Sequence, residues 1–192
     1  MDRNSLVYWL CIAGLLSASL FYGFSTEKVR RSVLREGGKI ENGSIVSLVR
    51  VIDGDTVLAA QEGQKPATIR ILGIKTFDTK IEKDIGSPYG KSAMDLIELL
   101  TRGRPIRVLL HSTPKDRHGR TIAVLYADEQ DVGLRLIRDG LALVYTVYPF
   151  PAMSLYLNEQ DLARNERRGL WANSEVAARA MTLFREWQGR SQ

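Results

Sequence analysis

Three segments of the sequence carry side chains that could act on a phosphodiester. Asp53 and Asp55 flank a glycine in the first segment. Arg70 and Asp78 lie in the second, and Arg120 ends the third. Carboxylates can hold a hard cation or orient a water molecule, and planar guanidinium groups can neutralise the charge that builds up on phosphate oxygens. The residue types and their order therefore predict a site directed at phosphodiesters.

Hydrophobic patterns predict strands around these side chains. Residues 44–52 and 55–60 are rich in Val, Ile and Leu and are separated by an Asp-Gly turn signal, so we expect an antiparallel hairpin. Residues 67–74 predict a third strand, in which Arg70 lies on the face opposite Ile69 and Ile71. Residues 106–110 and 122–127 are the remaining predicted strands.

The same patterns predict helices over residues 89–101, 132–138, 155–168 and 174–187. Three strands, a helix, two strands and then helices form an order that favours a small Greek-key barrel with helical cover. We therefore expect an α+β fold, a five-stranded OB-fold barrel with packed helices. Such a fold alone does not establish a function.

Several separated motifs of the chain resemble the staphylococcal nuclease (thermonuclease-like) family over residues 44–172. They are IDGDT at residues 52–56, RILGIKTFD at 70–78, DRHGR at 116–120, GLA at 140–142 and GLW at 169–171. The resemblance implies the OB barrel just described and calcium-dependent cleavage of DNA and RNA.

Position by position, the resemblance also implies roles for individual residues. Asp55 matches a metal-binding aspartate, and the backbone carbonyl of Thr76 matches a further metal ligand. Arg70 and Arg120 match the two arginines that bind the phosphate. Asp78 falls where the family has the glutamate that handles the attacking water. Tyr148 lies near the tyrosines that stack on a nucleotide base.

Lys75 departs from the family pattern, because it stands where the second metal-binding aspartate is expected. This exchange changes the local charge by two units, and at about 4 Å from a cation the repulsion is on the order of several kcal/mol. We therefore expect no calcium cofactor. The ammonium instead neutralises Asp55 and Asp78 or meets a substrate phosphate directly.

Taken singly, each of these residues has a simpler explanation. The Asp-Gly-Asp segment could be only a hairpin turn whose aspartates accept backbone hydrogen bonds. Arg70 could be an ion-pair partner on a strand, Arg120 a solvated loop end, and Tyr148 a core residue. Their combination at family spacing is what favours a phosphate-directed origin.

Charge gives only weak support for a nucleic-acid partner. The 192 residues carry a net charge of +5, but residues 44–173 hold 18 Lys and Arg residues against 16 Asp and Glu residues, a net charge of +2. That is a small basic excess for a nucleic-acid-binding domain.

Residues 6–24 contain no charged side chain, and nineteen residues are about the length that a helix needs to cross a bilayer. We expect a single-pass membrane anchor over residues 1–25. The alternative is a cleaved signal peptide and an exported protein. Because more cations follow the apolar run than precede it, we expect the barrel to face the cytoplasm. We expect residues 26–43 to be a basic linker. The barrel domain is then predicted over residues 44–173 and a helical tail over residues 174–192.

Two classes of function remain open from the sequence. The first is a slow or metal-independent phosphodiesterase that uses Arg70, Asp78 and Arg120. The second is a non-catalytic module that binds single-stranded nucleic acid, a nucleotide or a protein partner at the membrane through Tyr148 and Lys75. A purely structural barrel would be preferred if both arginines were bound in internal salt bridges.

Overall fold

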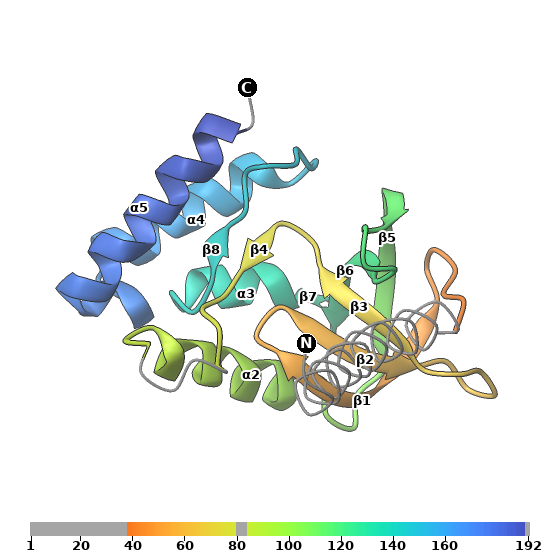
Figure 1. The fold of residues 1–192 in the computed structure, drawn as a ribbon. Helices are drawn as coiled ribbons and strands as arrows, with labels where there is room; N and C mark the ends of the chain where they lie inside the picture. Colours follow the sequence, from red (N-terminus) through yellow and green to blue (C-terminus); the bar gives the residue numbers. More distant parts are fainter. Residues whose placement is uncertain (1–37, 80–83, 191–192) are drawn as a thin grey trace, which may run out of the picture. The chain divides into compact units, whose positions relative to one another are not determined.

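Five strands of the chain close into a barrel (Figure 1). The computed structural model describes residues 38–79 and 84–190. The barrel strands are β1 (Ile45–Asp53), β2 (Thr56–Ala60), β3 (Ala67–Ile71), β5 (Ile106–Lys115) and β6 (Thr121–Ala127). Antiparallel pairing gives the order β3-β2-β1-β5-β6, and parallel pairing of β3 with β6 closes the ring. This is the OB arrangement, so the predicted α+β fold class is confirmed.

Strand register brings the first two motifs together. Asp53 pairs with Thr56 at the β1–β2 turn, and Thr56 pairs with Arg70 on β3. Alternation along β3 buries Ile69 and Ile71 in the barrel and leaves Arg70 on the other face, as predicted. Arg70 therefore lies beside the Asp-Gly-Asp turn.

The predicted strand over residues 67–74 is wrong beyond Ile71. Gly73 adopts a left-handed conformation (φ +76°) that turns the chain, and an added Cβ there would come 2.4 Å from the ring of Phe150. A separate strand, β4 (Ile74–Lys75), then pairs with β8 (Leu143–Val144). This turn carries Lys75 back toward the start of β2.

Helices cover the barrel and extend it on one side (Figure 1). They are α2 (Ser87–Thr101), α3 (Val132–Arg138), α4 (Met153–Asn165) and α5 (Ser174–Arg190), with a 3₁₀ turn η1 (Gly169–Ala172); the two-residue strand β7 (Gln130–Asp131) pairs with β6. The prediction for residues 132–138 is confirmed. Helix α4 ends three residues earlier than predicted, because Arg167 takes a left-handed conformation (φ +55°).

One hydrophobic core joins these layers. Ile69, Ile71, Ile97 and Leu136 are fully buried between the barrel and helices α2 and α3. Helix α5 buries Val176, Ala180, Phe184 and Trp187 in the same core. Their spacing of three and four residues places them on one helix face.

The predicted membrane-spanning run, residues 6–24, lies outside the described residues. Over residues 38–79 and 84–190, no helix combines the length and the apolar character that crossing a bilayer requires.

Candidate functional site

Asp55 is the centre of the candidate site. It lies in the β1–β2 turn, and its side chain is only 2% exposed. Its Oδ2 atom is 2.9 Å from Nη1 of Arg70 and 3.2 Å from Nζ of Lys75. Its Oδ1 atom accepts a hydrogen bond of 2.9 Å from the Thr56 hydroxyl. Two cations and a hydroxyl therefore hold one buried carboxylate.

The pKa values of Asp55 and Asp53 are shifted in opposite directions. Burial raises the pKa of Asp55, but the charges of Arg70 and Lys75 outweigh it and hold the pKa below its ordinary value. Burial raises the pKa of Asp53, and the negative charges of Asp55 and Asp78 raise it further. The charge of Asp78 thus acts on Asp53, so the three carboxylates share one neighbourhood.

Arg70 is held in place by three acceptors. Besides its ion pair with Asp55, its Nη1 donates to the Asp55 carbonyl at 3.0 Å and its Nη2 donates to the Ile74 carbonyl at 2.7 Å. Its side chain is 14% exposed. Burial lowers the pKa of Arg70, the Asp55 carboxylate opposes that shift, and the charge of Arg120 lowers the pKa further. The two arginines are also linked by contacts, because Arg70 pairs with Asp55 and the Thr56 hydroxyl that donates to Asp55 accepts from Arg120.

Arg120 reaches the same cluster from the end of the β5–β6 loop. Its Nε donates to Oδ2 of Asp116 at 2.7 Å, and its Nη1 donates to the Thr56 hydroxyl at 3.3 Å. Burial raises the pKa of Asp116, but hydrogen bonds from Arg120 lower it below the ordinary value. The Thr56 hydroxyl therefore connects Asp55 to Arg120.

Both arginines thus take part in internal salt bridges, the condition under which a structural barrel would be preferred. The three cations of the cluster differ in how far their side chains are exposed to solvent. The side chain of Lys75 is 44% exposed, against 28% for Arg120 and 14% for Arg70. Lys75 is therefore the cation of this cluster that is most open to a ligand.

The residues present do not fit a calcium ion in the family's manner. Both carboxylate oxygens of Asp55 already have partners, and the Lys75 ammonium lies 3.2 Å from Oδ2. Calcium requires six to eight oxygen ligands. In the described part of the chain, no group of three or more His, Cys, Asp or Glu residues could hold a metal.

Thr76 packs against the Asp-Gly-Asp turn, so the segment after Lys75 is close to that turn. A Cβ added to Gly54 would come 2.6 Å from the Thr76 hydroxyl oxygen, so only glycine fits this contact. Thr76 is buried, and its hydroxyl has no hydrogen-bond partner among the residues that the structure describes. Asp78, two residues on, is exposed.

An aromatic cluster adjoins the cations. Tyr148 is 66% exposed, and its ring centroid is 6.1 Å from that of Tyr145. Tyr145 packs edge-on against Trp187 at 5.1 Å, and its backbone N–H donates to the Gly73 carbonyl at 2.9 Å, directly before β4, which carries Lys75. Tyr148 is therefore an exposed ring in an aromatic cluster beside β4, and the explanation of Tyr148 as a core residue is wrong.

Four residues of this neighbourhood had no role in the sequence-based prediction: Thr56, Asp116, Tyr145 and Trp187. Thr56 directly follows Asp55 and Asp116 begins the segment that ends in Arg120, so their neighbours in sequence were a usable signal. Nothing in the local sequence indicates that Tyr145 meets Trp187, because 41 residues separate them.

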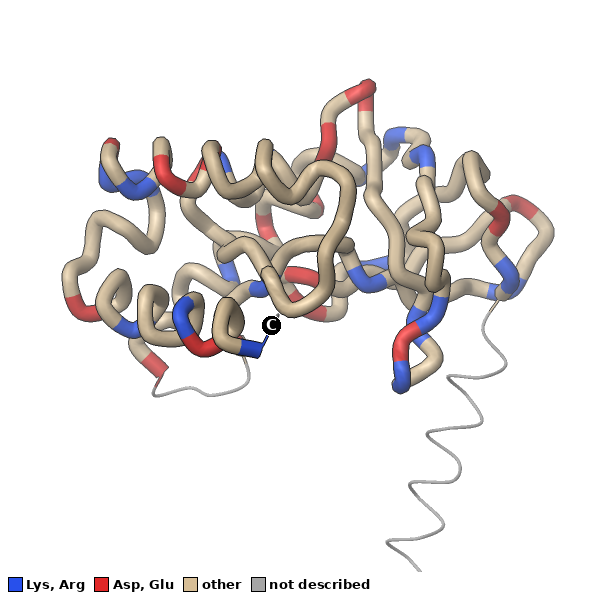
Figure 2. Tube along the Cα trace, turned by 90° about the horizontal axis from the view of Figure 1, so that it is seen from above, with Lys and Arg blue, Asp and Glu red and all other residues tan. Residues whose placement is uncertain are grey.

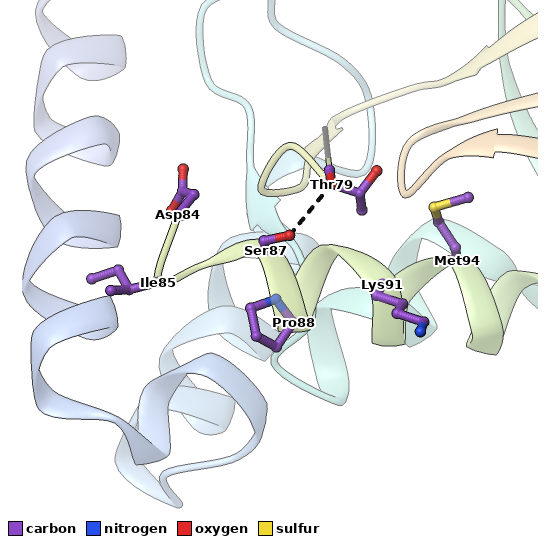
Figure 3. Close-up of a pocket in the computed structure, with 7 residues that line it drawn as sticks. All are labelled: Thr79, Asp84, Ile85, Ser87, Pro88, Lys91 and Met94. Atoms are coloured by element: carbon purple, nitrogen blue, oxygen red, sulfur yellow. Dashed lines mark hydrogen bonds between the residues drawn. The ribbon is translucent and has the colours of Figure 1, made fainter. Parts of the chain in front are cut away.

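A hollow of about 580 Å³ lies elsewhere, at the start of α2 (Figure 3). The Ser87 hydroxyl donates to the Thr79 carbonyl beside it, and Asp84 on its rim pairs with Arg179. Two polar groups of this hollow, those of Ser87 and Asp84, thus have partners within the chain, and no residue of its lining belongs to the Asp55 cluster.

Comparison with known proteins identifies relatives. A family model described as staphylococcal nuclease homologue matches residues 68–173. A thermonuclease of Staphylococcus hyicus is 28% identical over 133 residues, which cover 69% of this chain and 78% of the relative. A protein of Escherichia coli O157:H7 named as an uncharacterized endonuclease is 32% identical over 130 residues, covering 67% and 77%. Endonuclease YncB of Bacillus subtilis strain 168 is 32% identical over 133 residues, covering 67% and 62%.

Proposed function

Because the chain belongs to the family of staphylococcal nuclease homologues, we propose that its barrel binds the phosphodiester backbone of single-stranded nucleic acid without calcium. One observation carries the proposal. The Lys75 ammonium lies 3.2 Å from Oδ2 of Asp55 and remains 44% exposed, where the family resemblance places a second metal carboxylate. A built-in cation thus stands beside Asp55 and is open to a ligand.

The lysine suits binding better than hydrolysis. An ammonium neutralises one negative charge and can donate further hydrogen bonds to a phosphate oxygen. It carries half the charge of a divalent metal and cannot acidify a bound water comparably. Asp78 is also one methylene shorter than the glutamate that the resemblance implies, so its carboxylate lies farther from an attacking water. Any cleavage by the wild-type chain is therefore slow.

Arg70 and Arg120 have different roles toward the phosphate. Arg70 is mostly buried and holds Asp55 and the β3–β4 turn, so its main effect is positioning. Arg120 is more exposed and keeps guanidinium hydrogens beyond those that its Nε and Nη1 contacts use. Lys75 and Arg120 are thus the two cations that meet a phosphate.

Binding of a labelled single-stranded oligonucleotide tests this function. By fluorescence anisotropy we expect weak binding at low salt that falls as salt rises and does not change between EDTA and calcium. Lys75→Gln is expected to weaken it several-fold, because one phosphate contact is lost. Lys65→Gln removes an equal charge from the exposed β2–β3 turn and is the matched control. Failure to bind at low salt, or equal affinity of the Lys75 and Lys65 variants, would reject the proposal.

A separate prediction concerns Tyr148. Truncation to alanine is expected to weaken oligonucleotide binding by about 1 to 3 kcal/mol, because a base loses its stacking partner. Tyr148→Phe keeps the ring and should bind as the wild type does. The same anisotropy titration measures both, and a phenylalanine variant as weak as the alanine variant would show that the hydroxyl, not stacking, matters.

The internal salt bridges of both arginines favour a second candidate, a barrel whose cluster only stabilises the fold and whose surface binds a protein partner. The distribution of charge agrees with this candidate, since acids and cations alternate over the tube in the view of Figure 2. Under it, neither Lys75→Gln nor Tyr148→Ala would change the interaction with oligonucleotides, because the chain would not bind them.

We also propose that residues 6–24 anchor the chain in a membrane, with the barrel on the cytoplasmic side. Support comes from the nineteen uncharged residues and from the cations Lys28, Arg30, Arg31 and Arg35 that follow them. The anchor would place the barrel at a bilayer surface, while its site stays directed at nucleic acid.

The anchor predicts how the full chain fractionates. It should remain in the membrane fraction in high salt and in alkaline carbonate, because burial of apolar residues does not depend on screened charge. A chain without residues 1–25 is the control and should leave that fraction. Recovery of a soluble form that begins near Leu20 would instead support a cleaved signal peptide.

A further inference from the structure

A groove of about 510 Å³ lies where the end of α4, η1 and one side of α5 meet. Three arginines border it: Arg164 and Arg167 at the end of α4, and Arg185 on α5. Met181 and Trp171 are among the residues between them. The groove belongs to a different part of the molecule from the Asp55 cluster, which lies on the barrel strands and the β3–β4 segment.

None of the three arginines is neutralised within the described part of the chain. Arg164, Arg167 and Arg185 are exposed, and they form no ion pair or side-chain hydrogen bond over residues 38–79 and 84–190. The acid next to Arg167, Glu166, pairs with Arg168 instead. The lining of the groove contains no acidic side chain among the residues described there. Over the described residues, three guanidinium groups thus border one hollow whose lining supplies no negative charge.

The backbone at Arg167 supports a role for its side chain. This residue has φ +55°, a conformation that glycine adopts with less strain than any residue with a Cβ. It follows the end of α4, where glycine is the usual residue in that conformation. The chain places an arginine there and directs it to the rim of the groove.

The Arg185 end of the groove and the aromatic cluster of the candidate site share the last turns of α5. Arg185 lies two residues before Trp187, whose ring packs on Tyr145, which in turn contacts Tyr148. The lining residues of α5 begin at Ser174 and end at Arg185, roughly 16 Å at the 1.5 Å rise of a helix. Because residues two apart on a helix point to different faces, a strand that leaves Tyr148 passes around the C-terminal end of α5 to meet Arg185, and then reaches Arg164 and Arg167 at the end of α4.

We propose that this groove is a second phosphate-binding site, which holds the continuing backbone of the single-stranded nucleic acid that the Asp55 cluster binds; the inference rests on the proposed function. Arginine forks bind phosphate oxygens bidentately, and the mixed lining accommodates the sugar and base edges between phosphates. A concave groove with cations on both sides suits one strand better than a flat bilayer surface does.

Salt dependence and oligonucleotide length test the groove. The full chain, in a non-ionic detergent, is titrated with labelled oligothymidylates of about 3 and about 15 nucleotides, because single-strand sites of this kind cover roughly 4 to 16. The groove variant carries Arg164→Gln, Arg167→Gln and Arg185→Gln. The control variant carries Lys65→Gln, Arg102→Gln and Arg104→Gln, three exposed residues in the β2–β3 and α2–β5 turns, so both variants lose the same charge.

The groove variant should bind the short oligonucleotide as the control does and the long one more weakly. Three phosphate contacts contribute a slope of about 2 in log affinity against log salt, so between about 50 and 200 mM salt the control should lose about 20-fold more affinity for the long strand. Equal slopes and affinities for both variants would overturn the groove proposal.

Two further outcomes separate the proposals. If the short strand fails to bind while the long strand binds through the three arginines, the proposed function of the Asp55 cluster fails and the groove stands. The second arm measures, without detergent, the binding of residues 38–192, one compact unit that lacks the proposed anchor, to vesicles of about 30% phosphatidylserine. If the groove variant loses vesicle binding but keeps its affinity for the long strand, the groove belongs to the membrane and the inference is overturned.

Discussion

The double variant Lys75→Asp, Asp78→Glu is expected to cleave single-stranded DNA in calcium at least about 100-fold faster than the wild type, which should not respond to calcium. The first change replaces an ammonium 3.2 Å from Asp55 by a carboxylate. It removes the repulsion between this ammonium and a calcium ion, roughly 4 kcal/mol per unit charge of the ion, and it adds an oxygen ligand. The second restores the reach of the water-activating group, and a positioned general base contributes about 10² to 10⁴ in rate.

Calorimetry separates metal binding from chemistry in this variant. The wild type should give no heat with millimolar calcium and no rise in melting temperature, since only a ligand that binds the folded state stabilises it. The control Lys75→Gln, Asp78→Glu removes the ammonium without supplying a ligand and should also stay silent. A stoichiometric wild-type heat at micromolar affinity would contradict our interpretation of Lys75. An inactive but folded double variant would show that the cleft differs from the family's at further positions.

The parts of the fold that the sequence predicts well are local. The β1–β2 hairpin depends on one Asp-Gly turn, and α3 over Val132–Arg138 depends on apolar spacing within seven residues. The strand predicted for residues 67–74 fails at Gly73 because alternation continues through a glycine whose turn is decided by Phe150, 77 residues away. Local pattern cannot report such a contact.

The candidate site is likewise predictable in its local features and not in its long-range contacts. The types of Asp55, Arg70, Lys75 and Arg120 are visible in the sequence, but their connections are not. Lys75 reaches Asp55 because β4 pairs with β8 across nearly 70 residues, and Arg120 reaches the cluster through Thr56, 64 residues away. Sequence patterns therefore supply the members of the site, whereas the order of its hydrogen bonds depends on barrel closure.

Loss of the Asp55 carboxylate should destabilise the domain more than loss of the Lys75 ammonium. In Asp55→Ala, the Arg70 guanidinium stays 14% exposed but loses its counter-ion, and breaking such a buried pair costs about 3 to 5 kcal/mol of unfolding free energy. Lys75→Met removes a half-exposed partner and should cost at most about 1 kcal/mol. Urea unfolding of residues 38–192, one compact unit, measures both.

The double variant Asp55→Ala, Arg70→Met shows whether the cost comes from the stranded charge. Without the guanidinium no uncompensated cation remains, so the double variant should be more stable than Asp55→Ala alone.

The pH dependence of stability gives an independent check on the Asp55 ion pair. The pKa of Asp55 is lowered from 3.8 in the folded state, so its contribution is fully present above that unfolded value and is lost as pH falls through the lower folded value. The stability difference between wild type and Asp55→Ala should therefore be constant from about pH 5 to 8 and shrink below about pH 4. A difference that grows in acid would contradict the lowered pKa of Asp55. A double variant less stable than Asp55→Ala would mean that Arg70 finds another partner when Asp55 is removed.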